Sequence, residues 1–354
     1  MTARPPSGPV LAVRLDSDGD VLLTGPAVRA LAGTGDPVDL LVSPAGRSAA
    51  GLLPGVREVL VFDAPWTGFR PPPLSAPTMA RLIAELAARR YRRAVVFTSF
   101  HQSPLPMALL ARWAGVEWIA ATSVDYPGSL VDLRHVRPPG HEVTAALDLA
   151  VAAGGVLPAG DDGRLRVHRP LPPADHLAPA GDAVVVHPAA SVPARSLRPD
   201  HARRIAGGLV RRGWPVVVTG TAADRAAEPD IGAGVIDLRG RTTLPELAAV
   251  LAGARCVVAA NTGPAHLAAA VGTPVVSLFA PVVPAERWAP YGVPSILLGD
   301  QEAPCRDTRA RLCPVPGHPC LGGVTPDQVA DAVAALAPAG PRAGTARGAA
   351  AVPA

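Results

Sequence analysis

The stretch RCVVAANTGPAHLAAAVGTPVVSLF, residues 255–279, predicts a strand, a tight turn, a short helix and a second strand. Residues 257–260 form a short apolar run, which is typical of a strand covered on both faces. Pro264 suits the first position of a helix, because proline lacks the N–H group that would have no partner there. Gly272 is expected to end the helix, and residues 275–279 form the next strand. A unit of this kind indicates a parallel sheet covered by helices.

The polar residues Asn261, Thr262 and Gly263 fall where the first strand gives way to the helix. The start of a helix has free backbone N–H groups and the positive end of the helix dipole. At the carboxyl end of a buried parallel strand, such a start is a common phosphate site. The alternative is an ordinary turn in which Thr262 caps the helix and His266 packs. The sequence pattern alone does not decide between these two interpretations.

The chain has 354 residues, which is enough for two domains. No uninterrupted apolar stretch reaches the roughly 18–20 residues that span a bilayer, and the start MTARPPSGPV has no apolar signal region. We therefore expect a cytoplasmic protein. The net charge is +4, the arginines are dispersed and aromatic residues make up 4%. This composition does not favour nucleic acid as a partner, whereas peripheral attraction to an anionic membrane surface suits it better.

The sequence contains no lysine, and this excludes several kinds of chemistry. A P-loop needs a lysine on the nucleotide phosphates, and pyridoxal phosphate enzymes and Schiff-base aldolases need a lysine amine. The G-x-S-x-G motif of serine hydrolases is also missing. The run Gly33-Thr34-Gly35 has no third glycine at the required spacing, so the sequence lacks a dinucleotide-binding fingerprint.

Strands and helices alternate along both halves of the chain. In the first half the pattern predicts strands at residues 10–15, 38–42, 59–62, 94–98 and 116–119 and helices at 21–31, 78–91 and 104–113. In the second half it predicts strands at 183–187, 215–219 and 235–238 and helices at 199–212, 222–228, 244–252 and 325–336. Such alternation is typical of doubly wound parallel sheets.

The periodicity fades between residues 157 and 181, which are rich in Pro, Gly and Asp. We predict one Rossmann-like domain over residues 1–165, a linker over 166–182, a second Rossmann-like domain over 183–337 and a disordered tail over 338–354. The expected fold class is α/β, with two parallel sheets whose strand ends face a central cleft.

The second half resembles glycosyltransferase family 9, the heptosyltransferase-like enzymes of the GT-B fold. Residues 261–274 stand as N-T-G-P-A-H-L-A-A-A-V-G-T-P and are similar to the family's D-T-G-x-x-H-L-A-A-A-x-G-x-P. Residues 187–191, H-P-A-A-S, are similar to H-P-G-A-S, and residues 237–247 to D-L-x-G-x-T-x-L-x-E-L. At the N-terminus, residues 14–26 are similar to R-L-x-S-x-G-D followed by a proline. The matches occur in the right order along most of the chain.

This resemblance implies a metal-independent, inverting glycosyltransferase that needs no cofactor. The donor would be a nucleoside-diphosphate sugar, ADP-heptose in the best-known members, bound by the second domain. The acceptor, bound by the first domain, would be a glycan, a glycolipid or a small molecule, and the lipopolysaccharide core is the family's familiar target. Asp20 matches the general base, which takes the proton of the acceptor hydroxyl. The alternative for Asp20 is a helix cap.

The resemblance also implies the donor site. The positions that match it are Ser191, Arg195, Asp224, Asn261, Thr262, Gly263, Pro264, Ala265 and His266. The helix start and Arg195 would stabilise the leaving diphosphate. Asp224 would accept from the nucleoside, with a helix cap as its alternative. Asp16 and Asp18 are expected to be solvated loop charges.

Two departures from the family pattern bear on activity. Asn261 stands where the family has Asp. Asparagine can replace aspartate at this position only if the family's carboxylate serves to support the turn. Ala189 stands where the family has Gly. Two rivals to the transferase remain: a GT-B nucleotide-sugar epimerase, and a nucleotide-sugar-binding protein without catalysis.

Three cysteines lie in one Pro- and Arg-rich segment. Cys305, Cys313 and Cys320, with His318, could bind zinc. Their spacings of eight and seven do not match the close Cys pairs of structural zinc sites, so free thiols and no metal are the expectation.

Overall fold

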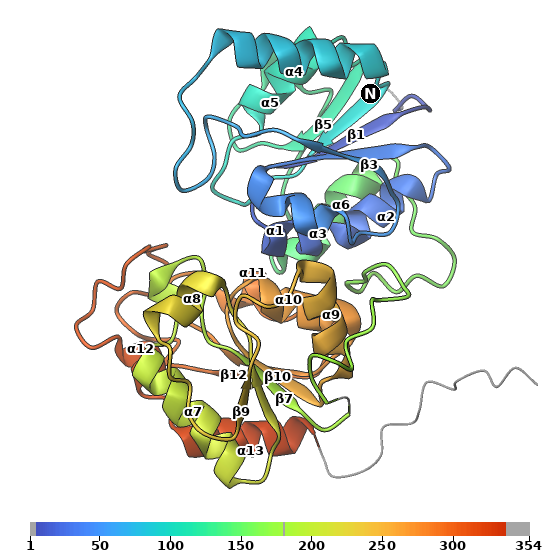
Figure 1. Ribbon diagram of the computed structural model, residues 1–354. Helices are drawn as coiled ribbons and strands as arrows, with labels where there is room; N and C mark the ends of the chain where they lie inside the picture. The colour runs from blue at the N-terminus through green and yellow to red at the C-terminus, as the bar shows by residue number, and fades with distance from the viewer. Residues whose placement is uncertain (1–4, 180, 338–354) are drawn as a thin grey trace, which may run out of the picture.

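The computed structural model describes residues 5–179 and 181–337, which form two α/β domains (Figure 1). Each domain contains a six-stranded sheet, with the strand orders β3-β2-β1-β4-β5-β6 and β12-β11-β10-β7-β8-β9. Every strand pair is parallel. The predicted fold class, two doubly wound domains with parallel sheets, is therefore confirmed. The predicted tail lies outside the described residues.

The N-terminal domain alternates strands and helices in chain order. Its elements are β1 (Val10–Arg14), α1 (Asp18–Leu23), α2 (Gly25–Ala32), β2 (Val38–Val42), η1 (Pro44–Gly46), α3 (Arg47–Ala50), β3 (Val56–Val61), α4 (Ala76–Arg89), β4 (Arg93–Val96), α5 (Leu105–Trp113), β5 (Trp118–Thr122), η2 (Gly128–Leu130), β6 (Leu133–His135) and α6 (Glu142–Ala152).

The C-terminal domain repeats this alternation. Its elements are β7 (Val184–His187), η3 (Pro193–Arg195), α7 (Pro199–Arg211), β8 (Val216–Val218), α8 (Ala222–Ala227), β9 (Val235–Asp237), α9 (Leu244–Gly253), β10 (Cys256–Ala260), α10 (Gly263–Val271), β11 (Val275–Leu278), α11 (Ala285–Trp288), β12 (Ser295–Leu298), α12 (Pro319–Gly322) and α13 (Pro326–Leu336).

The structure differs from the predicted elements in two ways. The helix expected at residues 21–31 is divided into α1 and α2, because Pro26 lies in the first turn of α2 and cannot donate the backbone hydrogen bond that a continuous helix needs. The prediction also missed β6, β12, α6 and the four-residue helices α3, α11 and α12. β6 is a three-residue edge strand, and α6 is apolar around most of its surface, so neither carries a clear period.

The segment that decides the fold has the predicted structure. All five residues of β10 are buried, and β10 lies between β7 and β11. Thr262 is the N-cap residue of α10, although its side chain makes no capping hydrogen bond. Gly272 ends the helix with a φ of 86°, a left-handed conformation that favours glycine.

The two domains meet where α1 and α10 begin (Figure 1). Gly19 and Gly263 touch backbone to backbone: a Cβ added to Gly19 would lie 3.2 Å from the Gly263 Cα and 3.3 Å from the His266 Cδ2. A second contact joins His141, the N-cap of α6, to the other domain through a 2.9 Å hydrogen bond between its Nε2 and the Ala289 carbonyl. The ring of His141 also packs on Tyr291, with centroids 4.8 Å apart.

The close contact at Gly19 leads to a stability prediction. In Gly19→Ala, the added methyl group meets backbone that can yield only if α1 moves away from α10. We expect this variant to lose about 1–2 kcal/mol of unfolding free energy through overpacking, measured by urea denaturation. Gly207→Ala is the matched control, because its Cβ would meet only Arg211, at 3.5 Å. The control should gain about 0.5–1 kcal/mol from helix propensity. Equal changes in the two variants would contradict tight packing at the domain contact.

Candidate active site

Two adjoining cavities lie between the domains, at the carboxyl ends of both sheets. The larger, which we call the cleft cavity, has a volume of about 410 Å³. The smaller, the junction cavity, has a volume of about 60 Å³ and lies against the domain contact. Both cavities are lined by Ser17, Asp20, Ser191, Arg195 and Trp288. Asn261, Thr262, Gly263 and His266 line the junction cavity.

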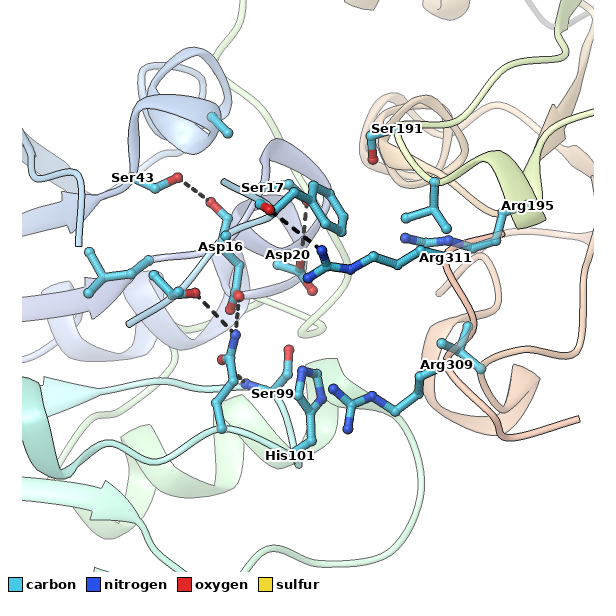
Figure 2. Close-up of a pocket in the computed structure, with 18 of the residues that line it drawn as sticks. Asp16, Ser17, Asp20, Ser43, Ser99, His101, Ser191, Arg195, Arg309 and Arg311 are labelled. Atoms are coloured by element: carbon cyan, nitrogen blue, oxygen red, sulfur yellow. Dashed lines mark hydrogen bonds between the residues drawn. The ribbon is translucent and has the colours of Figure 1, made fainter. Parts of the chain in front are cut away.

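Asp20 lies in α1 and is held from two sides. Its Oδ1 accepts from Arg14 Nη2 at 3.1 Å and its Oδ2 from Ser17 Oγ at 3.1 Å. The N-cap of α1 is Ser17, so Asp20 is not the cap residue itself. Arg14 is buried at the end of β1 and also donates to Ser99 Oγ at 2.9 Å. The carboxylate is therefore fixed in orientation and lines both cavities (Figure 2).

Asp16 is not the solvated loop charge that we expected from the sequence. Its Oδ2 lies 2.8 Å from Arg14 Nε, and its Oδ1 accepts from Gln102 Nε2 at 2.5 Å. Burial, with a smaller effect of the nearby Asp20 carboxylate, raises the pKa of Asp16 to about 6, against the opposing effect of Arg14. The prediction failed because Gln102 and its loop fold over a residue 86 positions earlier in the chain.

Asp18 is not solvated either. Its Oδ1 accepts the backbone N–H of Ala49 at 2.9 Å, and burial raises its pKa. This contact ties the first turn of α1 to α3, so the carboxylate has a structural role that local sequence could not reveal.

Asn261 braces the junction between β10 and β11. Its Nδ2 donates to the Ala280 carbonyl and its Oδ1 accepts the Ala280 N–H, both at 3.4 Å. An amide suits this position, because it can both donate and accept, whereas an ionised carboxylate could only accept. The departure from the family's Asp thus leaves the turn supported.

Arg195 supplies a cation to both cavities. It ends η3, and its Nη1 lies 3.5 Å from the Asn261 carbonyl. Burial lowers its pKa, opposed by the attraction of Asp20. Ser191 is exposed beside it. The structure therefore brings Ser191 and Arg195 to the start of α10, as the sequence predicts.

His266 lies in the first turn of α10 and is buried. Burial lowers its pKa to about 4, so the ring is neutral at pH 7 and adds no positive charge. Its Nδ1 is buried without a hydrogen-bond partner among the described residues. Pro264 and Ala265, which complete the predicted donor set, form the same helical turn but do not line either cavity.

Asp224 lies apart from this cluster. Its carboxylate forms a capping box with Thr221, accepting from the backbone N–H and the hydroxyl of Thr221 at 2.7 Å each. It lines neither the cleft cavity nor the junction cavity. The contacts of the Asp224 carboxylate are therefore those of the alternative role, helix capping.

Further basic residues of the cleft were missed by sequence reasoning. Figure 2 shows Arg309 and Arg311 projecting from the C-terminal domain toward the Asp16 and Asp20 side of the cleft. Arg309 lies 5.9 Å from the centre of the Phe100 ring and Arg311 lies 4.8 Å from that of Phe69. Their segment stood out for its cysteines and arginines, but its position over the cleft depends on tertiary structure.

The cysteine segment forms no metal centre within the described residues. No group of three or more His, Cys, Asp and Glu side chains in residues 5–179 and 181–337 is arranged to hold a metal ion. Cys305, Cys313 and Cys320 have free thiols. Burial, with the neighbouring thiols, raises the pKa of Cys320 to about 12, so this thiol stays protonated. His318 is engaged instead with the Ala194 carbonyl at 3.1 Å.

The fold and the cavities define a protein of two doubly wound α/β domains with a cleft between them, and comparison with known proteins names the family. The model of glycosyltransferase family 9 (heptosyltransferase) matches residues 79–317. The chain therefore belongs to this family, as its motifs predicted.

Curated relatives match over part of their length. The chain is 39% identical over 114 residues to lipopolysaccharide heptosyltransferase 1 of Pseudomonas aeruginosa. This match covers 31% of this chain and 32% of that protein. It is 33% identical over 147 residues to lipopolysaccharide heptosyltransferase 3 of Escherichia coli. This match covers 39% of this chain and 43% of that protein. The matched segments thus span less than half of either relative.

Solved structures share the fold over nearly the whole chain. E. coli ADP-heptose lipopolysaccharide heptosyltransferase II has a TM-score of 0.70 at 19% identity, covering 92% of this chain and 98% of that one. A family 9 glycosyltransferase from Veillonella parvula has a TM-score of 0.74 at 16% identity, covering 95% and 98%.

The environment of Asp16 predicts a pH-dependent change in stability. Because its pKa is raised in the folded state, the folded protein binds this proton more tightly than the unfolded chain does. Its contribution to stability is therefore complete below about pH 4 and is lost as the pH rises through about 6. We expect Asp16→Asn to raise the free energy of unfolding by about 2–3 kcal/mol at pH 8 and to change it little at pH 4.

Urea denaturation at the two pH values measures this difference. Asp63→Asn is the control, because Asp63 lines the same cavity but is exposed. A gain of the same size at pH 4 and pH 8 would mean that the ionisation of Asp16 is not responsible.

Proposed function

We propose that this protein transfers a sugar from a nucleoside-diphosphate sugar to an acceptor hydroxyl, with inversion at the sugar carbon. One observation carries the proposal: Asp20 from one domain and the start of α10 from the other line the same junction cavity. The first is a base for the acceptor, and the second is a site for the leaving phosphates. Membership of the family supports this pairing of roles.

Asp20 is the proposed general base. As the acceptor oxygen forms a bond to the sugar C1 atom, its proton passes to the Asp20 carboxylate. The bond from C1 to the diphosphate oxygen breaks, and its electron pair leaves with the nucleoside diphosphate. The hydrogen bonds from Arg14 and Ser17 orient the carboxylate but leave it lining the cavity. A carboxylate positioned in this way contributes roughly 10²–10⁴-fold to such a step.

The start of α10 and Arg195 are proposed to stabilise the departing diphosphate. Negative charge grows on the phosphates as the C1–O bond breaks, and free N–H groups, the helix dipole and a guanidinium favour that charge. Thr262 and Gly263 provide the helix start, and Arg195 lies against it. This arrangement supplies positive charge from the protein itself, which supports a metal-independent reaction.

The nucleotide is proposed to be ADP and the sugar heptose-like. One solved structure with the same fold is that of E. coli heptosyltransferase WaaC with ADP, and the curated relatives are lipopolysaccharide heptosyltransferases. By the same likeness, the acceptor would be a cell-envelope glycan or glycolipid. Among the described helices, none is both long and apolar enough to cross a bilayer. Exposed Trp113 and Tyr126 would suit peripheral contact with the cytoplasmic face of a membrane.

Replacement of the base tests the proposed mechanism. We expect Asp20→Asn to lower kcat by about 10²–10⁴-fold and to leave the ADP affinity within twofold, because Asp20 acts on the acceptor. Nucleotide release from ADP-heptose reports turnover and calorimetry reports binding. Ser17→Ala, which removes only one hydrogen bond to Asp20, should retain most of the activity. Full activity in Asp20→Asn would assign the base elsewhere.

Nucleotide binding without metal is tested by thermal unfolding. ADP at a hundredfold excess over its Kd should raise Tm by about 5 °C, with or without EDTA. Arg195→Ala should lose most of this rise, whereas Arg212→Ala should keep it, because Arg212 binds Asp327 and Asp331 on α13. A shift abolished by EDTA would show that a metal takes part. No shift with ADP, GDP, UDP or dTDP sugars would contradict the proposed function, and binding without turnover would favour the non-catalytic rival.

A further inference from the structure

Two arginines on the C-terminal side of the cleft cavity have no carboxylate partner. Arg309 and Arg311 line this cavity and project toward its Asp16 and Asp20 side (Figure 2). Within the described ranges 5–179 and 181–337, neither guanidinium forms an ion pair. Asp16 and Asp20, which line the same cavity, bind Arg14 instead. The two arginines therefore bring uncompensated positive charge to the cleft.

An aromatic ring of the N-terminal domain lies beneath each of these guanidinium groups. The Cζ atom of Arg309 is 5.9 Å from the centre of the Phe100 ring, and that of Arg311 is 4.8 Å from the centre of the Phe69 ring. A guanidinium that lies over a ring keeps the N–H groups in its own plane free to donate. Arg311 uses one of them in a long contact of 3.5 Å with the Phe69 carbonyl. The side chain of Arg309 makes no hydrogen bond in the described part of the chain, so most donors of the pair are available to a ligand.

The backbone of this segment is fixed to the C-terminal domain. The N–H of Arg309 donates to the Val282 carbonyl at 2.8 Å, and the carbonyl of Arg311 accepts from the Ala194 N–H at 3.0 Å. Arg309 has a φ of 56°, a left-handed conformation that an arginine rarely adopts. The two hydrogen bonds hold this conformation, so the arginines belong to a defined wall of the cavity.

No neighbouring group of the cavity wall neutralises Arg309. Burial, with repulsion from Arg309, lowers the pKa of His101 to about 4, so this ring is uncharged at pH 7. His101 lines the same cavity and therefore leaves the charge of Arg309 as it is.

The two arginines are separate from the site proposed for the leaving diphosphate. Arg195 and the start of α10 line the junction cavity, whereas Arg309 and Arg311 line only the cleft cavity. An anion bound by Arg309 and Arg311 would therefore be a second one, carried by the other substrate.

We infer that Arg309 and Arg311 bind an anionic group of the acceptor, a phosphate or a carboxylate, across the cleft from Asp20. This inference rests on the proposed function and narrows the acceptor to one that carries an anion besides its reacting hydroxyl. It also assigns recognition of that anion to the C-terminal domain, although we expected the first domain to bind the acceptor. Guanidinium groups match the oxygen pairs of phosphates and carboxylates. A cavity of about 410 Å³ has room for a sugar with such a group.

Binding of three small sugars to the full chain tests the inference by calorimetry, with ADP in excess to fill the nucleotide site. The probes are glucose 6-phosphate, glucuronate and the neutral methyl glucoside. We expect at least one anionic sugar to bind about tenfold tighter than the methyl glucoside or better, and the tighter of the two identifies the group. The double variant Arg309→Gln, Arg311→Gln should lose this preference and keep the ADP affinity of the wild type.

Arg306→Gln is the matched control. Arg306 belongs to the same segment, but it binds Glu302 at 2.7 Å and lines neither the cleft cavity nor the junction cavity. This variant should keep the preference for the anionic sugar. The rise in Tm with ADP shows that each variant is folded.

Equal binding of the neutral and the anionic sugars to the wild type would overturn the inference, and so would an unchanged preference in the double variant. A loss of ADP affinity in the double variant as large as its loss of probe affinity would overturn it too, because the arginines would then serve the donor. ADP binding to the wild type without a preference for an anionic sugar rejects this inference alone. A preference for an anionic sugar without any nucleotide binding rejects the proposed function alone.

Discussion

The site depends on one close approach, the backbone contact between Gly19 and Gly263 at the starts of α1 and α10. A side chain at Gly19 would press on the Gly263 backbone, so that α1 and α10 would have to move apart by a few tenths of an ångström. Because Asp20 follows Gly19 directly, the contact also sets how far the carboxylate lies from the start of α10. Two residues without side chains therefore bring a carboxylate and the start of a helix to one small cavity.

Charge is distributed unevenly around this contact. Arg14 is shared by Asp16 and Asp20, so two carboxylates are held by one buried cation, and burial keeps the pKa of Asp16 high. On the opposite wall, Arg195 is itself partly desolvated, and burial lowers its pKa. Such unfavourable burial is common where groups must act on a substrate instead of stabilising the fold.

The sequence was a good guide where chemistry is local. It predicted the strand–helix–strand unit around Thr262, because proline and glycine mark the ends of a helix by their own backbone constraints. It also placed Ser191 and Arg195 with that unit, through family motifs. It was wrong for Asp16 and Asp18, which read as exposed because their partners, Gln102 and Ala49, come from distant segments. No local pattern records such a partner.

By itself, the sequence determined the fold class, the family and the residues at the helix start. Alternating apolar runs and a specific motif can be recognised without knowledge of the contacts between residues. The tertiary structure alone decided that Asp20 and α10 share a cavity, that Asp224 forms a capping box with Thr221, and that Arg309 reaches the cleft. A cavity is the space left between packed elements, and its shape depends on how the elements of the two domains meet in three dimensions.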